Sequence, residues 1–251
     1  MNKEKAYKLL ALQEKISNSK AKELIDRGLV FYKNEKLQMA RTMLNSSAKF
    51  TVKKLQDIKI IFEDDKIIAV NKPYSVLSEE IQDKLKTRLL NRLDKETSGL
   101  LLLCKDEDFR IKCVKEFKEQ KVYKSYIAIL NGIVPQEIDI DEPILVKKTK
   151  NSAFAKISKD GLEAHTKIIP LMVNAKKTLA KILIKTGRTH QIRLHTAFIN
   201  NGILGDEKYA KSRSVRMFLH SFECKIFNYH FIAPLDNDFE KLGFDIKNLN
   251  F

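Results

Sequence analysis

Four polar segments of the chain carry the residue types that perform acid–base and nucleophilic chemistry: residues 71–73, 91–99, 121–126 and 186–195. The second segment places the carboxylate of Asp94 among basic residues, and the fourth holds two arginines and two histidines. Each segment joins an apolar run to a polar loop. Loops on a rigid sheet are where catalytic groups are usually placed, so these segments are the candidates for an active site.

Each segment taken alone also has a purely structural explanation. Arg92 and Asp94 could form a surface ion pair, and residues 97–99 could be a plain turn before a strand. Arg188 and Arg193 could be solvated charges on a helix. The functional interpretation therefore depends on the segments occurring together.

The histidines and cysteines do not predict a metal site. His190 and His195 are five residues apart, which places them about 140° apart around a helix, whereas the ligands of a zinc helix share one face. Cys104, Cys113 and Cys224 lack the close pair spacing of a zinc ribbon or a disulfide framework. We interpret the cysteines as small buried apolar residues.

Apolar runs from residue 58 onward predict the sheet that positions these segments. Residues 58–62 and 67–70 flank an acidic turn and predict a hairpin. Four further runs bring the expected number of strands to at least six: residues 100–103, 126–130, 167–173 and 179–184.

Two helices are predicted among these strands. Phe109, Cys113 and Phe117 share one face of the first helix, and the second begins near Thr189 and ends before Gly202. Strand pairs, separate helices and few strand–helix–strand alternations favour an α+β class over a doubly wound sheet. We expect a mixed, mainly antiparallel sheet.

Residues 1–57 predict a small α+β domain of their own, separate from residues 58–251. An amphipathic helix fits residues 7–16, and a second helix follows from the capping residues near Ser17 to Gly28. Short strands are expected after that glycine and near residue 50.

Positive charge is concentrated in that first segment. The whole chain has 47 Lys plus Arg against 32 Asp plus Glu, a net +15. Residues 1–57 hold 13 basic and 6 acidic side chains, net +7, so the other 194 residues hold 34 and 26, net +8. Such a balance favours nucleic acid as a partner, although a solvated lysine-rich surface explains the charge equally well.

No segment predicts insertion into a membrane. Apolar runs are shorter than the roughly 18 residues needed to span a bilayer, and the lysine-rich N-terminus lacks the apolar region of a signal peptide. We expect a soluble, cytoplasmic monomer with no membrane partner.

Five separated motifs resemble, in identity and order, those of RluA-type pseudouridine synthases, and the match spans roughly residues 58–235. The motifs are Val-Asn-Lys-Pro at 70–73, Arg-Leu-Asp-x-x-Thr-Ser-Gly-Leu-Leu at 92–101, Lys-Ser-Tyr-x-Ala at 124–128, Thr-Gly-Arg-Thr-His-Gln-Ile-Arg-Leu-His at 186–195 with Gly-Asp-x-x-Tyr at 205–209, and Leu-His at 219–220. The order Ser-x-Ser-Lys-Ala-Lys-x-Leu-Ile-x-x-Gly-Leu-Val at 17–30 resembles an S-four-like RNA-binding module, and the resemblance covers roughly 50 residues. We therefore expect residues 1–57 to form such a domain, which several members of that family carry before the catalytic one.

The resemblance implies that uridine in RNA is isomerised to pseudouridine. The glycosidic bond to nitrogen is cut, the uracil rotates, and a carbon–carbon bond forms to the same sugar. Asp94 would attack the base or the sugar, or abstract the ribose 2′ proton, and the sequence leaves these mechanisms open. Arg193 matches the arginine that pairs with the aspartate, and Tyr126 matches the tyrosine that stacks on the uracil.

The remaining matched residues are expected to bind RNA. Arg92 matches the arginine that fills the stack or supports the phosphate after the nucleotide flips out. Lys72, Arg188 and His190 are expected to contact the RNA backbone or to order loops. Substrate and product are isomers, so no nicotinamide, flavin or metal is required, and the chain has no dinucleotide-binding glycine motif.

Two features depart from the family pattern. Asn91 stands where the family usually has His before Arg-Leu-Asp, which puts a loop hydrogen bond in doubt. The segment between Lys72 and Arg92 is short, which removes loop length that would contact the substrate.

Three functions remain as alternatives. The leading one is modification of 23S ribosomal RNA, with transfer RNA as a second target. A non-catalytic RNA-binding or ribosome-assembly factor would be expected to lack the aspartate, tyrosine or arginine, and all three are present. A glycosidase normally needs two placed carboxylates, and only Asp94 lies in a recognisable motif.

Overall fold

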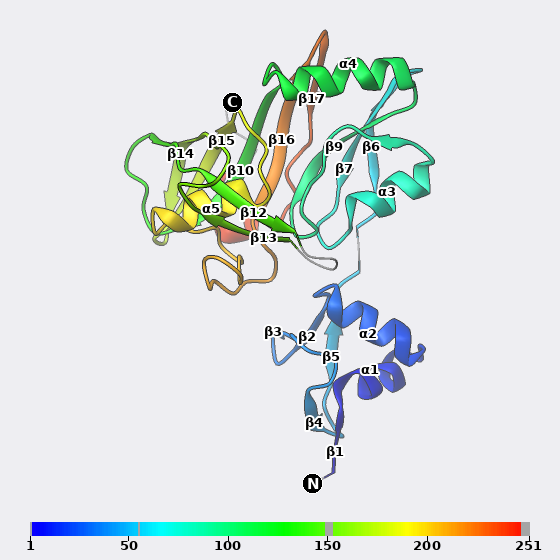
Figure 1. Cartoon of the computed structure of the whole chain (residues 1–251). Helices are drawn as coiled ribbons and strands as arrows, with labels where there is room; N and C mark the ends of the chain where they lie inside the picture. The colour runs from blue at the N-terminus through cyan, green and yellow to red at the C-terminus, as the bar shows by residue number, and fades with distance from the viewer. Residues whose placement is uncertain (1, 55, 149–152, 247–251) are drawn as a thin grey trace. The chain divides into compact units, whose positions relative to one another are not determined.

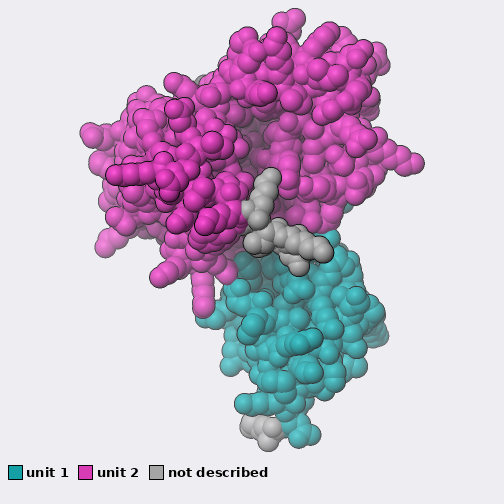
Figure 2. Space-filling view, in the orientation of Figure 1, with its two compact units in different colours: residues 1–57 teal, residues 58–251 magenta. Residues whose placement is uncertain are grey.

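The computed structural model describes residues 2–54, 56–148 and 153–246, which fold as two compact units, residues 1–57 and 58–251 (Figures 1 and 2). The division falls where the composition changes from a helical, strongly basic segment to an apolar, strand-rich one.

The N-terminal unit packs two helices on short strands. Helix α1 (Ala6–Glu14) precedes α2 (Asn18–Asp26), whose cap residue Ser17 accepts a hydrogen bond from the Lys20 amide at 3.1 Å, as its sequence predicts. Strand β2 (Val30–Tyr32) lies between β3 (Glu35–Lys36) and β5 (Phe50–Val52). A second ladder pairs β1 (Lys3–Lys5) with β4 (Met43–Asn45), and the polar composition of β1 gave no signal for it.

The C-terminal unit is built on one large sheet, which confirms the α+β class (Figure 1). Its strands follow the order β11-β14-β15-β10-β16-β9-β7-β6, with β17 paired to β16 and β8 paired to β9. Their bounds are β6 (Lys59–Glu63), β7 (Ile67–Lys72), β8 (Arg88–Leu89), β9 (Ser98–Cys104), β10 (Tyr123–Asn131), β11 (Ile138–Ile140), β14 (Thr166–Asn174), β15 (Lys177–Ile184), β16 (Leu219–Ile226) and β17 (Tyr229–Ile232).

A short parallel pairing joins the two halves of this sheet. Strands β9 and β16 pair only through Ser98 with His220 and Gly99 with Ser221, whereas the other ladders in the described part of the sheet are antiparallel. Gly99 has φ +107°, and a Cβ there would lie 2.2 Å from the Ser221 carbonyl oxygen. Glycine is therefore required where the two strands pair.

Both faces of the central strands are buried, which explains their continuous apolar runs. Leu101 and Leu103 of β9 pack in one cluster with Tyr126, while Leu100 and Leu102 pack in another on the opposite face. This second cluster also contains Cys113 and Cys224, and all three cysteines are buried and free, as expected.

Helices cover these faces and carry the site loops. Helix α3 (Ser78–Leu85) follows β7, and α4 (Glu107–Lys118) packs on the face beside β9 (Figure 1). Helix α5 (Gln191–Phe198) contacts the hairpin of β12 (Ile144–Lys148) and β13 (Ala153–Ile157). Helices α4 and α5 match the sequence prediction. In the part of the chain that the structure describes, no helix has the length and apolar content needed to cross a membrane.

Candidate active site

Asp94 lies in the loop between β8 and β9 and is held by an arginine from α5. Arg193 Nη1 donates to Asp94 Oδ2 at 3.0 Å, although 99 residues separate the two in the sequence. The other side of the same guanidinium binds Asp206 with two hydrogen bonds, from Nε at 2.8 Å and from Nη2 at 3.0 Å. One planar group therefore aligns two carboxylates.

The two carboxylates have different surroundings. The Asp206 side chain has no exposed area, whereas 26% of the Asp94 side chain is exposed. Asp206 also accepts from the backbone amides of Lys208 and Tyr209. Asp206 is thus fully engaged, and Asp94 keeps an accessible face for a substrate.

Electrostatics keep the buried Arg193–Asp206 pair ionised. Burial alone would raise the pKa of Asp206, but the Arg193 hydrogen bonds and charge outweigh it and lower the pKa. Burial likewise opposes the charged form of Arg193, and the carboxylates of Asp206 and Asp94 nevertheless raise its pKa. Arg193 is a cation with 6% exposed area, not the solvated helix charge of the structural alternative.

His190 also lies close to Asp94, near the oxygen that accepts from Arg193. It is the cap residue of α5, with a left-handed backbone at φ 56°, and its Nε2 is 3.7 Å from Asp94 Oδ2. Its Nδ1 is 2.7 Å from Tyr209 Oη, and the two rings meet edge to face. The sequence predicted for His190 an RNA contact or the ordering of a loop. The structure in addition places its ring beside Asp94.

Tyr126 closes the apolar side of the same pocket. It belongs to β10, is 9% exposed, and burial raises the pKa of its phenol, so the hydroxyl stays protonated. Asp94, Arg193 and Tyr126 come from three different elements and meet at this one pocket. It is lined by Arg92, Leu93, Asp94, Thr97, Tyr126, Ile184, Gly187, Arg188, His190, Gln191, Ile192, Arg193 and Leu219.

Two predicted RNA-binding arginines lie at this pocket. The Arg92 side chain is 75% exposed and pairs with Glu79 of α3, with Nη2 and Oε1 2.8 Å apart. Arg188 Nε donates to the Glu163 carbonyl at 2.9 Å. Arg92 is the more accessible of the two to an incoming phosphate.

Lys72 does not fit its predicted role as an RNA contact. Its side chain is completely buried, and Nζ donates to the carbonyls of Pro73, Val76 and Lys95 at 3.1, 2.7 and 3.3 Å. Burial lowers the pKa of Lys72 to about 7, but three carbonyl acceptors match the three donors of the ammonium form. The correction is that Lys72 takes only the second of its two predicted roles and orders the loop next to Asp94.

Two further side chains hold the Asp94 loop. Ser78 Oγ donates to the Leu93 carbonyl and accepts from the Leu93 amide, both at 3.1 Å. Asn91, in place of the usual His, accepts from the Leu102 amide at 2.8 Å and so extends the ladder between β8 and β9. At the position where the family usually has His, Asn91 thus makes a side-chain hydrogen bond to β9.

His195 does not join a metal site in this geometry. Its Nδ1 is 2.9 Å from Thr166 Oγ1 and its Nε2 is 2.9 Å from the Glu142 carbonyl, so both ring nitrogens have protein partners. Within residues 2–54, 56–148 and 153–246, no group of three His, Cys, Asp or Glu side chains could hold a metal ion.

Sequence reasoning did not assign roles to Asp206 and Tyr209. Both lie in the Gly-Asp-x-x-Tyr motif, and Gly205 has φ +84°, with a Cβ position only 1.9 Å from the Arg216 carbonyl oxygen. The Gly-Asp-x-x-Tyr pattern could have predicted these roles, because a glycine next to polar residues is typical of a sharp turn. That turn brings Asp206 to Arg193 and Tyr209 to His190.

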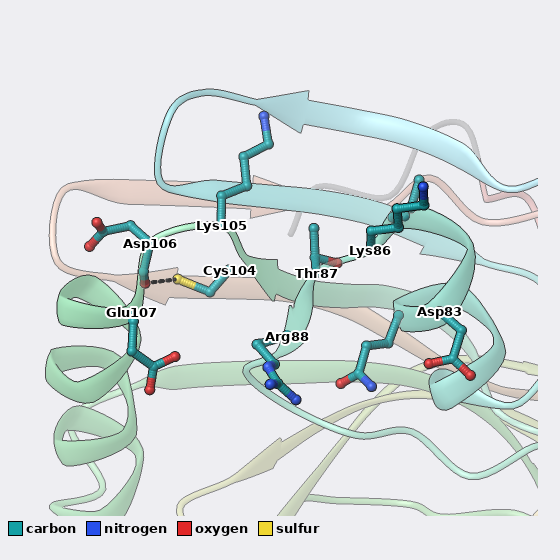
Figure 3. A pocket seen from close by; sticks show the side chains of 10 residues that line it. Asp83, Lys86, Thr87, Arg88, Cys104, Lys105, Asp106 and Glu107 are labelled. Atoms are coloured by element: carbon teal, nitrogen blue, oxygen red, sulfur yellow. Dashed lines mark hydrogen bonds between the residues drawn. The ribbon is translucent and has the colours of Figure 1, made fainter.

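A second hollow lies away from Asp94, among the end of α3, the end of β9 and the start of α4 (Figure 3). It carries charges of both signs and shares no lining residue with the Asp94 pocket. Cys104 Sγ donates there to the Asp106 carbonyl at 3.0 Å, so the thiol is engaged.

Comparison with known proteins identifies the family. Residues 29–198, which include Asp94, Tyr126 and Arg193, match the family model described as RNA pseudouridylate synthase. The chain belongs to the RNA pseudouridylate synthase family. It is accordingly an isomerase that acts on RNA, and its resemblance to RluA-type enzymes is confirmed.

Several relatives are similar over much of their length. An uncharacterized RNA pseudouridine synthase of Helicobacter pylori strain J99 is 47% identical over 241 residues, covering 94% of this chain and 99% of the relative. Ribosomal large subunit pseudouridine synthase C of Rickettsia prowazekii is 35% identical, covering 67% of this chain and 63% of the relative. Ribosomal large subunit pseudouridine synthase D of Borreliella burgdorferi is 30% identical, covering 67% of this chain and 61% of the relative.

Solved structures share the fold. Human RNA pseudouridylate synthase domain containing 1 superposes with a TM-score of 0.64 at 25% identity, covering 76% of this chain and 89% of that one. Human RNA pseudouridylate synthase domain containing 4 gives a TM-score of 0.62 at 22% identity, covering 72% and 90%.

Proposed function

We propose that this enzyme converts specific uridines of 23S ribosomal RNA to pseudouridine and that Asp94 is the essential group. The observation that carries the proposal is the meeting of Asp94, Arg193 and Tyr126 in one pocket. Asp94 alone among these offers an accessible carboxylate, with 26% of its side chain exposed.

The pocket has the parts that the isomerisation requires. Arg193 orients Asp94 through the hydrogen bond from Nη1 to Oδ2 at 3.0 Å, as a carboxylate that acts as a nucleophile or a base requires. The face of Tyr126 supports a uracil that has left its stack. Arg92, exposed beside the pocket, is available to replace the flipped base or to bind its phosphate.

The N-terminal unit is proposed to act as an S-four-like RNA-binding domain that selects the target. Two helices pack there on short strands, in the most basic segment of the chain. Several of its cations are exposed: Lys33, Arg41, Lys49 and Lys54. Two of the relatives described above are named as synthases of the large ribosomal subunit, which supports ribosomal over transfer RNA.

The other candidate functions are less well supported. A non-catalytic RNA-binding protein would not require the buried Arg193 to align an accessible carboxylate. A hydrolase with two catalytic carboxylates would need a second free one, and Asp206 is fully buried and bound to Arg193.

The test compares the wild-type chain with Asp94→Asn on 23S ribosomal RNA and on transfer RNA labelled with tritium at carbon 5. We expect the wild type to release tritium from ribosomal RNA and Asp94→Asn to release it at less than a few per cent of that rate. Both proteins should bind RNA with similar affinity, because the cationic surface is unchanged. Asp160→Asn, an exposed carboxylate, serves as the matched control. Substantial turnover by Asp94→Asn would refute the role of Asp94, and preferential release from transfer RNA would refute the proposed target.

A further inference from the structure

We propose that His190 is a second catalytic residue and that its Nε2 accepts the proton that leaves carbon 5 of the uracil. This inference rests on the proposed function of the Asp94 pocket. It assigns to His190 a proton-transfer role in place of the RNA contact or loop ordering that the sequence suggested.

The position of His190 is unusual for a residue that only caps a helix. Its side chain makes no capping hydrogen bond to α5, and its backbone is left-handed at φ 56°. Such a conformation is uncommon outside glycine. Here it places the ring at the pocket beside Asp94, where 16% of the side chain is exposed.

Hydrogen bonding around the ring leaves Nε2 as an acceptor. Tyr209 Oη donates to the Ala155 carbonyl at 3.3 Å, so the same oxygen can accept from His190 Nδ1 at 2.7 Å. With the proton on Nδ1, Nε2 carries a lone pair. The distance of 3.7 Å to Asp94 Oδ2 is too long for a hydrogen bond and is close enough for an ion pair once Nε2 gains a proton.

No other lining group of this pocket is suited to the task. The side chains of Arg92, Arg188 and Arg193 are cations, and the Tyr126 phenol stays protonated because burial raises its pKa. Gln191 is an amide already bonded to Thr186 and Thr166. Asp94 and His190 are thus the two proton acceptors, and the family mechanisms use Asp94 on the base or the sugar.

The charges around His190 favour the neutral base. Burial is the main cause that lowers its pKa, and Arg193 of α5 and Lys208 of the following loop lower it further. Asp94 and Glu96, from the loop before β9, act in the opposite direction without reversing the net lowering. The ring is therefore neutral near pH 7 and becomes charged on acidification.

The proton transfer balances the reaction. After carbon 5 bonds to C1′, the C5–H bond breaks, and its electron pair re-forms the ring double bond. The proton passes to His190 Nε2, where the resulting imidazolium faces Asp94. It is then released to water, while the uracil N1 that lost its sugar gains a proton from water. No oxidant, reductant or additional reactant is needed.

The experiment uses the full chain with two variants of His190. Asparagine tolerates a left-handed backbone and lacks the base, so His190→Asn is expected to lower the saturating rate by roughly 10²- to 10⁴-fold with unchanged RNA affinity. Because proton removal then limits the rate, deuterium at carbon 5 should slow His190→Asn more than it slows the wild type. His190→Gly also fits this backbone, and added imidazole should restore part of its rate.

Controls separate this inference from the function on which it rests. His230→Asn changes a half-exposed histidine paired with Glu223 and should behave as the wild type. A saturating rate of His190→Asn within three-fold of wild type would overturn the proposal. A large loss with neither an isotope effect nor imidazole rescue would also overturn it, in favour of a structural role. Absence of pseudouridine formation by the wild-type chain would instead refute the proposed function.

Discussion

At the scale of single residues, Arg193 makes two hydrogen bonds to Asp206 but only one to Asp94. The two hydrogen bonds to the buried Asp206 fix the plane of the guanidinium, so that the remaining Nη1 points toward Asp94. Nη1 also lies 3.8 Å from Oε2 of the exposed Glu96, which is a weaker contact. Asp206 is therefore a positioning residue that acts on Asp94 through Arg193.

We expect Arg193→Lys to lower the saturating rate at least about 10²-fold. An ammonium cannot reproduce the planar fork that spans both carboxylates, and a misplacement of about 1 Å is enough for a loss of this size. Tritium release measures the rate, and Arg213→Lys, an exposed arginine, is the control. A rate near wild type in Arg193→Lys would show that the fork is not needed.

A second prediction concerns His220, which is buried and neutral. Its Nε2 is 3.0 Å from the Ala233 carbonyl, and its Nδ1 is 2.8 Å from Ser98 Oγ. Burial lowers the pKa of His220 to about 3, against about 6.5 in the unfolded chain. Since the unfolded state then binds more protons between these values, the free energy of unfolding should fall as the pH falls from 6.5 toward 3.

Urea unfolding at pH 6.5 and pH 5 measures this contribution. One proton contributes at most about 1.4 kcal/mol per pH unit. We expect His220→Gln to be less stable than wild type at pH 6.5 but to lose less of its free energy of unfolding on acidification. Equal losses in the two proteins would assign the effect to other groups.

At the scale of elements, helix α3 anchors the loop that carries Asp94. Ser78, the first residue of α3, is 1% exposed and bridges both backbone groups of Leu93. Ser78→Ala leaves that buried amide and carbonyl without this partner, so we expect it to lower the free energy of unfolding by about 1–3 kcal/mol and to reduce kcat. Thermal unfolding and tritium release test the two effects.

Ser158, whose hydrogen bond lies in an exposed turn, is the control for the effect of burial on the stability loss in Ser78→Ala. Ser158 Oγ accepts only a long hydrogen bond of 3.4 Å from the Asp160 amide, in an exposed turn. Ser158→Ala should change stability by less than about 0.5 kcal/mol. If Ser78→Ala behaved in the same way, the loop would be held chiefly by Lys72.

The strands were more predictable than the surroundings of the site. Apolar runs at 67–70 and 100–103 gave β7 and β9 because both faces of these strands are buried. Helix α3 was missed because its sequence, Ser-Glu-Glu-Ile-Gln-Asp-Lys-Leu, is mostly polar and was interpreted as a short loop.

The identity of the site residues was predictable, but their burial was not. Asp94, Tyr126 and Arg193 were named from motifs, and the structure brings them together. Of the two roles predicted for Lys72, the RNA contact is wrong because its side chain is fully buried, which is seldom the case for lysine. Its three carbonyl partners come from loops whose mutual approach is a tertiary property. The motif that contains Asp206 was quoted, but nothing in the sequence indicates that this aspartate shares the guanidinium of Arg193 with Asp94.

At the scale of the whole molecule, the basic N-terminal unit is expected to supply RNA affinity and not chemistry. Deleting residues 1–57 should leave a folded isomerase, since the core of the C-terminal unit is formed within residues 58–251. Loss of roughly three to five phosphate contacts should make the slope of log affinity against log salt shallower by about 0.7–0.9 per contact. Filter binding over a salt series measures this slope.

Wild type and truncated protein should therefore converge in affinity as salt rises. Tritium release from a short RNA that contains the target uridine is the control, and it should be nearly equal for both proteins. An unchanged salt slope together with an unchanged pattern of modification in 23S RNA would show that the N-terminal charge is only a solvated surface. It would also remove this support for a ribosomal target.

The parallel pairing of β9 and β16 has a consequence for the order in which the enzyme is synthesised. Asp94 precedes β9, whereas Arg193, Asp206 and β16, the strand that pairs in parallel with β9, all follow later in the chain. During synthesis the aspartate thus leaves the ribosome about one hundred residues before the arginine that aims it. Ser98 is likewise synthesised 122 residues before His220, its hydrogen-bond partner. Nascent chains that end before β16 should consequently bind RNA through their basic segment without modifying it.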